Sequence, residues 1–302
     1  MKIGYTALNW TIGCNGAKTF RLKSYSHKKF IETAKNNLDC LLTMLKFNVE
    51  NNLLFFRITS RLIPFASHPI MDFDWKGYFK DNFNEISEVI HEKDIRISMH
   101  PGQFVVVNSK DTDVFERGLN ELKYHSEVFD ILNLDSTAKM QVHVGGVYGN
   151  KEKSMERFIE RYQNLDKNIK RRLVIENDEK SYNLSECLEI SNQTKIPVLF
   201  DYFHHELNKT DEDLEGCFRN FTKTWKTKDG LPLVDYSSQN PEKAKGTHIE
   251  SIDIDHFKNF LKETSNFDFD IMLEIKDKEA SALKAVEILK YDNRFKKYTQ
   301  NL

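Results

Sequence analysis

The sequence predicts a single (β/α)8 barrel whose functional site lies at the carboxyl ends of its strands. Eight short apolar segments alternate strictly with longer amphipathic segments, which implies a parallel sheet. Eight such repeats favour a closed barrel over an open doubly wound sheet. The chain has 302 residues and is 39% hydrophobic, enough for one barrel with a full core. No glycine-rich linker or low-complexity segment divides it, so we expect one domain over residues 1–302.

The predicted strands are rich in Ile, Val, Leu, Phe or Met, as expected of strands that are buried on both faces. They are Ile3–Asn9, Leu54–Ile58, Ile95–His100, Met140–Val144, Leu173–Asn177, Pro197–Tyr202, Leu231–Tyr236 and Ile271–Ile275. The segments between them place apolar residues at helical spacing. The predicted helices are Lys28–Asn51, Tyr78–Lys93, Thr112–Leu132, Glu152–Asp166, Leu184–Thr194, Asp211–Trp225, Asp253–Glu263 and Glu279–Lys290.

Overall composition indicates no particular partner. The formal net charge is -2, from 44 basic and 46 acidic residues, and no apolar run is long enough to span a membrane. The four cysteines form no CxxC pair and fit a reducing cytosol better than a disulfide framework: Cys14, Cys40, Cys187 and Cys217. The first residues resemble a strand and not a signal peptide. We therefore expect a cytoplasmic protein with no obligatory protein partner.

Residues of metal-ligating types recur at the ends of consecutive predicted strands, although an unpaired charge is costly in a buried strand. They are His100, His143, Glu176, Asp201 with His204, Asp235 and Glu274, while His68 and His248 lie in loops after the second and seventh strands. In a barrel these positions converge at the carboxyl-end face. One strand-end histidine is more often structural, but a run through successive repeats predicts a multinuclear site for divalent metal ions.

Five histidines lie outside this set of candidate ligands. Within DYFHH we prefer His204 as the ligand, because it follows Asp201 by three residues in a turn that leaves the strand, although His205 could replace it. The other four lie on or beside predicted helices with charged neighbours and are expected to be solvated surface residues: His27, His91, His125 and His256.

An ordered set of short motifs runs along nearly the whole chain. They are IGYTALN at the start, FRLKSY at 20–25, FFRITSRLIPFASHP at 55–69, SMHPGQF at 98–104, HVGGVYGNKE at 143–152, IEND at 175–178, DYFHH at 201–205, DYSSQ at 235–239, GTH at 246–248 and LEIKDKE at 273–279. Together they resemble the ultraviolet damage endonucleases, which are DNA repair nucleases with a TIM-barrel fold akin to endonuclease IV.

The resemblance implies a set of site residues. Its metal ligands fall on His68, His100, His143, Glu176, Asp201, His204, Asp235, His248 and Glu274, the same residues that the strand ends indicate. It places a DNA-probing pair at Gln103 and Phe104, and a lesion-pocket aromatic at Tyr5 with Asn9 nearby. Basic residues at strand ends, among them Arg57 and Lys151, are expected to contact the DNA backbone.

The chain departs from the family pattern at two places. Much of the family has a lysine and a histidine where this chain has Leu233 and Asp235. That lysine can be carboxylated in relatives, whereas Leu233 cannot. Oxygen from Asp235 favours a harder ion, so we expect two or three Mn²⁺ ions, with Zn²⁺ or Mg²⁺ as alternatives. Phe104 stands where relatives often have tyrosine, and an apolar wedge can also unstack bases.

The resemblance implies incision of damaged double-stranded DNA immediately 5′ to ultraviolet photoproducts and other lesions. Metal-activated hydroxide would attack the phosphodiester, with Glu176, Glu274, His100 and His143 as catalytic residues. One alternative is a metal-dependent sugar isomerase or epimerase, which would use a similar ligand ring without a Gln–Phe wedge. Another is a non-catalytic DNA-damage sensor, which would not need so many buried ionisable groups.

Overall fold

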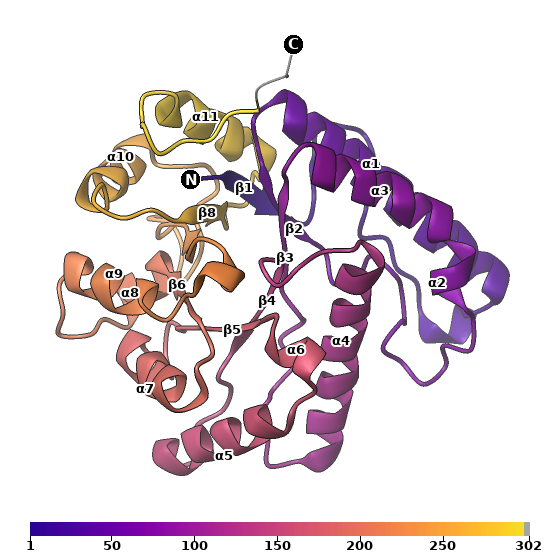
Figure 1. The fold of residues 1–302 in the computed structure, drawn as a ribbon, viewed down its shortest axis with the longest axis horizontal. Coiled ribbons are helices and arrows are strands. Elements are labelled where there is room, and N and C mark those ends of the chain that lie inside the picture. The colour runs from indigo at the N-terminus through magenta and orange to yellow at the C-terminus, as the bar shows by residue number, and fades with distance from the viewer. Residues whose placement is uncertain (299–302) are drawn as a thin grey trace.

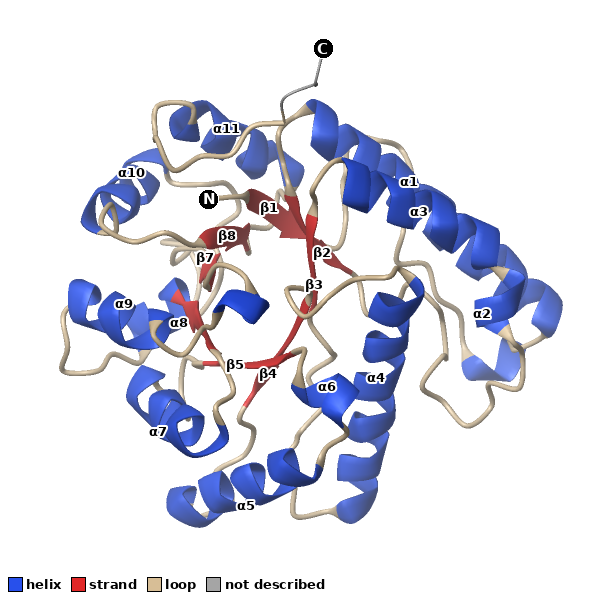
Figure 2. Ribbon diagram, in the orientation of Figure 1, coloured by secondary structure: helices blue, strands red, loops and turns tan. Residues whose placement is uncertain are grey.

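The strands form a closed parallel barrel in chain order, with β8 pairing back to β1 (Figures 1 and 2). This computed structural model describes residues 1–298, so residues 299–302 of the predicted domain lie outside the described part. The strands are β1 (Ile3–Thr6), β2 (Phe55–Ile58), β3 (Arg96–Met99), β4 (Lys139–His143), β5 (Leu173–Glu176), β6 (Val198–Asp201), β7 (Leu233–Tyr236) and β8 (Asp270–Leu273). The predicted (β/α)8 TIM barrel is confirmed.

Helices surround the strands as an outer ring (Figure 2). They are α1 (His27–Glu50), α2 (Trp75–Tyr78), α3 (Lys80–Glu92), α4 (Thr112–Ile131), α5 (Lys151–Asn164), α6 (Lys167–Lys170), α7 (Leu184–Thr194), α8 (Tyr202–Leu207), α9 (Leu214–Thr222), α10 (Ile254–Glu263) and α11 (Glu279–Leu289). Two 3-10 turns are η1 (Leu22–Ser24) and η2 (Thr227–Asp229). Within residues 1–298, no helix combines the length and the apolar character needed to cross a membrane.

Most predicted elements agree with the structure to within a few residues, and α7 has the predicted bounds. The predicted helix Tyr78–Lys93 corresponds to α3, which begins two residues later, and the separate short helix α2 precedes it. The predicted helix Asp211–Trp225 is shorter, because the Asp213 side chain accepts the Gly216 N–H and caps α9. The short helices α2, α6 and α8 were not predicted, since a segment of one turn or two shows no helical periodicity.

Strand register brings ligand types side by side at the carboxyl end of the barrel. His143 pairs with Glu176 between β4 and β5, and Asp201 pairs with Asp235 between β6 and β7. Neighbouring strands lie about 4.8 Å apart, so residues at the same level can bring their side chains into contact. The barrel therefore provides the frame for a cluster of ionisable groups.

The opposite, amino end of the barrel is closed by buried ion pairs. Lys139 Nζ lies 2.6 Å from Asp229 Oδ1, and Arg96 Nη1 lies 2.7 Å from Asp270 Oδ2. All four side chains are buried. Each charge has a partner of opposite sign, which offsets the cost of removing it from water.

The structure corrects the expectations for two cysteines and two histidines. Cys14 and Cys40 form a disulfide that links the loop after β1 to α1, whereas the sequence favours free thiols. His125 is fully buried on α4, where its Nε2 lies 3.4 Å from Glu121 Oε1, and is not a surface histidine. His256 is half-buried, with Nδ1 2.6 Å from the Tyr236 hydroxyl. Helix periodicity did not reveal these inward-facing positions.

Gly4 in β1 allows the close approach of β2. A Cβ at this position would lie 1.5 Å from the Phe55 carbonyl oxygen. We expect Gly4→Ala to lower the free energy of unfolding by about 3 kcal/mol or more, measured by chemical denaturation. Gly118→Ala on α4 is the control, because its Cβ would come no closer than 3.4 Å to Val105. We expect this control to change stability by less than about 1 kcal/mol; similar losses for both variants would contradict the prediction.

Candidate metal centre

Glu176, the last residue of β5, lies among three of the predicted imidazole ligands. Its side chain is 1% exposed. His100 Nε2 is 3.5 Å from Glu176 Oε2, while His143 Nε2 and His204 Nδ1 are 3.9 and 3.3 Å from Oε1. Two ligand atoms that are each about 2.1 Å from one ion stand roughly 3–3.5 Å apart. The arrangement therefore fits a divalent ion bound between the rings and the carboxylate.

Three overlapping groups of side chains could each hold an ion, because their candidate ligand atoms lie within 4.8 Å of one another. The groups are His100, His143 and Glu176; Glu176, Asp201 and His204; and Asp201, Asp235 and Glu274. Glu176 belongs to the first two groups, and Asp201 belongs to the last two. Carboxylates at these shared positions can bridge neighbouring ions. Seven of the nine predicted ligands thus come together.

The tautomers of His100 and His248 also suit metal binding. His100 Nδ1 lies 3.0 Å from the Pro101 carbonyl oxygen, and His248 Nδ1 lies 2.8 Å from that of Glu274. A carbonyl can only accept a hydrogen bond, so each Nδ1 carries the proton and Nε2 keeps its lone pair for a metal. His248 belongs to none of the three groups, but its ring centroid lies 6.3 Å from that of His204. It borders the centre.

Two other candidate histidines lie apart from the centre. His68 is exposed in the loop after β2, and its Nδ1 accepts a hydrogen bond from the Ile70 N–H. His205 is buried against Phe200, with ring centroids 5.1 Å apart, and its Nε2 lies 3.9 Å from Cys217 Sγ. Helix α8 begins directly after Asp201, and it brings His204, not His205, to Glu176.

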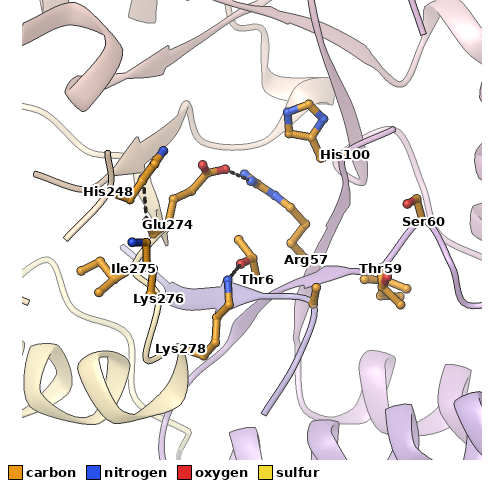
Figure 3. Close-up of a pocket in the computed structure, with 12 residues that line it drawn as sticks. Thr6, Arg57, Thr59, Ser60, His100, His248, Glu274, Ile275, Lys276 and Lys278 are labelled. Carbon is orange, nitrogen blue, oxygen red and sulfur yellow. Dashed lines mark hydrogen bonds and ion pairs between the residues drawn. The ribbon is translucent and has the colours of Figure 1, made fainter. Parts of the chain in front are cut away.

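Arg57, which the sequence predicts to contact the DNA backbone, enters the centre from β2. Its side chain is 4% exposed. Nη2 lies 2.6 and 2.8 Å from the two carboxylate oxygens of Asp235, and Nη1 forms an ion pair with Glu274 (Figure 3). The guanidinium therefore supplies a fixed positive charge to the third ligand group.

Gln141 is a site residue that sequence reasoning missed. Its Nε2 donates hydrogen bonds to Glu176 Oε2 and Asp235 Oδ2, each 2.7 Å long. It fixes the orientation of two carboxylates that belong to different groups. A signal for it exists in the sequence, because it precedes His143 by two residues and so shares its face of β4.

The centre perturbs several pKa values in the metal-free protein. Burial raises the pKa of Asp201 to about 7. Burial opposes a charge on His204, but Asp201 and Glu176 outweigh this effect and raise the pKa of His204 to about 11. Burial also opposes a charge on Glu274, but Arg57 lowers the pKa of Glu274 to about 2. Protons and Arg57 thus balance part of the buried negative charge.

The expected lesion-pocket residues are buried and face the helix layer. Tyr5 is fully buried, and its hydroxyl donates a 2.7 Å hydrogen bond to Asn48 Oδ1 of α1. Asn9 Nδ2 donates to the same hydroxyl at 2.9 Å and is 2% exposed. Contact with a flipped base would require both side chains to leave these positions. In this structure they support the loop after β1.

The other residues expected to contact DNA lie on the surface around the mouth of the barrel. Gln103 and Phe104 are exposed in the loop between β3 and α4, and Phe104 is 54% exposed. Lys151 is half-buried at the start of α5, with its Nζ 2.5 Å from Glu186 Oε1. The structure therefore leaves Gln103 and Phe104 free to meet another molecule, whereas Lys151 already has an ion-pair partner.

Comparison with known proteins identifies the family of this chain. The family model described as UV-endonuclease UvdE matches residues 1–300. The chain belongs to the UvdE family. A UV DNA damage endonuclease from Clostridium perfringens (strain 13 / Type A) is 40% identical over 296 residues, 97% of this chain and 72% of that protein. Another, from Bacillus thuringiensis subsp. konkukian (strain 97-27), is 34% identical over 299 residues, 96% of this chain and 94% of that protein.

Solved structures agree with the family assignment. The crystal structure of SacUVDE has a TM-score of 0.93 and 42% identity, and the match covers 97% of this chain and 99% of that one. Endonuclease IV from Thermus thermophilus matches with a TM-score of 0.55 and 14% identity over 82% of this chain and 93% of that one. D-psicose 3-epimerase from Clostridium cellulolyticum has a TM-score of 0.58 and 12% identity over 97% and 99%. The last two show a shared barrel fold.

Metal binding at this centre should compete with protons. A divalent ion requires deprotonated Asp201 and His204, whose pKa values in the metal-free protein are about 7 and about 11. We therefore expect Mn²⁺ to displace protons, and its affinity to fall at least ~10-fold per pH unit between about pH 8 and pH 6. Calorimetric titrations in two buffers with different ionisation enthalpies measure this proton release. Binding with no release of protons would contradict the prediction.

Proposed function

We propose that this chain is a metal-dependent endonuclease that cuts DNA immediately 5′ to ultraviolet photoproducts. The observation that carries the proposal is a buried centre of three overlapping ligand groups in a member of the UvdE family. The relatives named above are UV DNA damage endonucleases. A centre rich in carboxylates and imidazoles suits hydrolysis of a phosphodiester, since the reaction needs a deprotonated water and stabilised negative charge.

Different side chains of the centre would have different roles in the reaction. Divalent ions bound there would lower the pKa of water and stabilise charge on the phosphate. His100 and His143 would hold one side of the centre, while Asp201 and His204 would hold the other. Glu176 would link both sides. We propose Mn²⁺, in two or three copies, because imidazoles combine here with many carboxylate oxygens; Zn²⁺ and Mg²⁺ are the alternatives.

Gln103 and Phe104 are proposed to probe the DNA duplex. A cavity of about 320 Å³ adjoins this loop, and it is lined by Gln103, His100 and His143 among others. A damaged base pair costs less to open than an intact one, and an exposed aromatic ring can fill the gap that it leaves. This arrangement would connect lesion recognition directly with the metal centre.

A sugar epimerase on the same barrel is the rival that nuclease assays distinguish. We expect the purified protein with Mn²⁺ to nick ultraviolet-irradiated plasmid and to leave undamaged plasmid intact. Glu176→Gln should reduce nicking by about 10³-fold or more, because it removes the charge shared by two ligand groups. Agarose gels that separate nicked from supercoiled plasmid give the rates.

The matched control is Glu85→Gln, since Glu85 is exposed on α3. This variant should keep the wild-type rate. The Glu176→Gln variant should still bind irradiated DNA, which separates lost chemistry from lost binding. If the wild-type protein nicks neither plasmid in Mn²⁺, the proposed function is wrong, and unchanged nicking by Glu176→Gln would remove that carboxylate from the mechanism.

Phe104→Ala should weaken binding to a duplex that carries one photoproduct by about 10-fold, because stacking by the ring is lost. Binding to undamaged duplex should change by less than about 3-fold. Fluorescence anisotropy measures both affinities. Tyr291→Ala is the control. Tyr291 is 93% exposed and lies just after α11, toward the amino end of the barrel and away from its mouth. Equal losses on both duplexes would argue against a probing role.

A further inference from the structure

A second cavity, of about 370 Å³, opens beside the metal centre between the ends of β1, β2 and β8 (Figure 3). It shares His100, Arg57 and Glu274 with that centre, and His248 at the border of the centre also lines it. The polar side chains of its lining are mostly hydrogen-bond donors. Besides the two imidazoles, three hydroxyl groups and three cationic side chains stand against one carboxylate: Thr6, Thr59, Ser60, Arg57, Lys276, Lys278 and Glu274. Such a lining suits an anion.

Only one of the three cations lacks an acidic partner within the described residues. Arg57 is engaged by Asp235 and Glu274. Lys276 Nζ lies 2.9 Å from Glu250 Oε1. Lys278 Nζ, in contrast, donates a 2.8 Å hydrogen bond to the neutral hydroxyl of Thr6. An ammonium group has three donors, so Lys278 can donate to further acceptors in the cavity.

The backbone holds Lys278 in an unusual conformation. It has φ 52° and ψ −113° and stands directly before α11. A non-glycine residue pays a free-energy cost in this region, and such residues persist where the surrounding structure over-determines them. Here the Lys278 N–H donates to the Ile275 carbonyl, and the Lys278 carbonyl accepts from the Ala282 N–H. These contacts direct the side chain toward Thr6 and the cavity (Figure 3).

We propose that Lys278 and Thr6 bind a DNA backbone phosphate that neighbours the phosphate being cut. This inference rests on the proposed nuclease function, and it assigns a phosphate subsite beside the metal centre. A phosphodiester carries one negative charge and two free oxygens, which match an ammonium and a hydroxyl donor. Because the cavity wall includes Glu274, a strand that places one phosphate at the metal centre brings an adjacent phosphate to Lys278. Lys278 would then position the strand and take no part in bond breaking.

Salt dependence of binding tests the charge contact. Each phosphate contact that a protein loses reduces the slope of log Kd against log salt concentration by about 0.9. We expect Lys278→Gln to reduce this slope by about 1 for a duplex with one photoproduct, measured by anisotropy with Ca²⁺ in place of Mn²⁺. Lys290→Gln is the control, because that exposed lysine lies outside the cavity, at the end of α11, and pairs with Glu287. The control should leave the slope nearly unchanged.

Neutral methylphosphonates locate the contact on the DNA. They are placed one at a time around the incision site. At one phosphate, the substitution should weaken binding by the wild-type protein but not binding by the Lys278→Gln variant. An unchanged slope for Lys278→Gln would overturn the subsite. So would losses of affinity from Lys278→Gln and from the methylphosphonate that simply add at every phosphate tested. If Lys278→Gln does not fold, the wild-type scan still decides, since the absence of any sensitive phosphate within two positions of the cut overturns the subsite.

Failure of the subsite can be distinguished from failure of the proposed function. Wild-type protein that neither binds nor nicks irradiated DNA would refute the nuclease function itself. Wild-type protein that nicks irradiated DNA, while Lys278→Gln keeps its salt slope, would refute the subsite alone. A positioning role for Lys278 further requires that KM for lesion DNA rises more than kcat falls.

Discussion

The structure of the barrel mouth depends on the burial of negative charge. Glu176, Asp201 and Asp235 are each no more than 1% exposed, and Glu274 lies beside them. Carboxylates in such a place are stable only when cations, protons or hydrogen-bond donors balance them. Strand register produces this crowding, because β5 to β8 deliver these side chains to adjoining positions at one end of the barrel. The imidazoles, Gln141 and Arg57 supply the positive charge and the hydrogen-bond donors that balance these carboxylates.

The balance is uneven across the centre. On the side of β3 to β6, Glu176 is surrounded by imidazoles that can give up their protons and bind metal ions. On the side of β2, β7 and β8, Arg57 already neutralises part of the charge of Asp235 and Glu274. This second side includes Asp235, where the resemblance described above leads one to expect a histidine. An aspartate there adds a negative charge, and a guanidinium that cannot be deprotonated compensates it.

The barrel itself does not specify a reaction. Epimerases and endonuclease IV share it at low identity, and function resides in the groups that line the mouth. In this chain two cavities flank the same buried centre. One lies beside the exposed Gln103 and Phe104, and the other beside Lys278 and Thr6. An apolar ring on one side and an ammonium on the other suit the bases and the phosphates of a nucleic acid, respectively, rather than a small sugar.

The sequence alone determined the alternation of strands and helices and the residue types at the strand ends, because hydrophobic period and polar residues in buried strands are local signals. It could not determine which partner each side chain meets. Arg57 was expected to contact the DNA backbone, but it pairs with Asp235, 178 residues away in the chain. Cys14 and Cys40, the buried His125 and the inward-facing Tyr5 were likewise missed. Such contacts depend on barrel closure and loop paths, which only the tertiary structure decides, because they join residues that no local pattern relates.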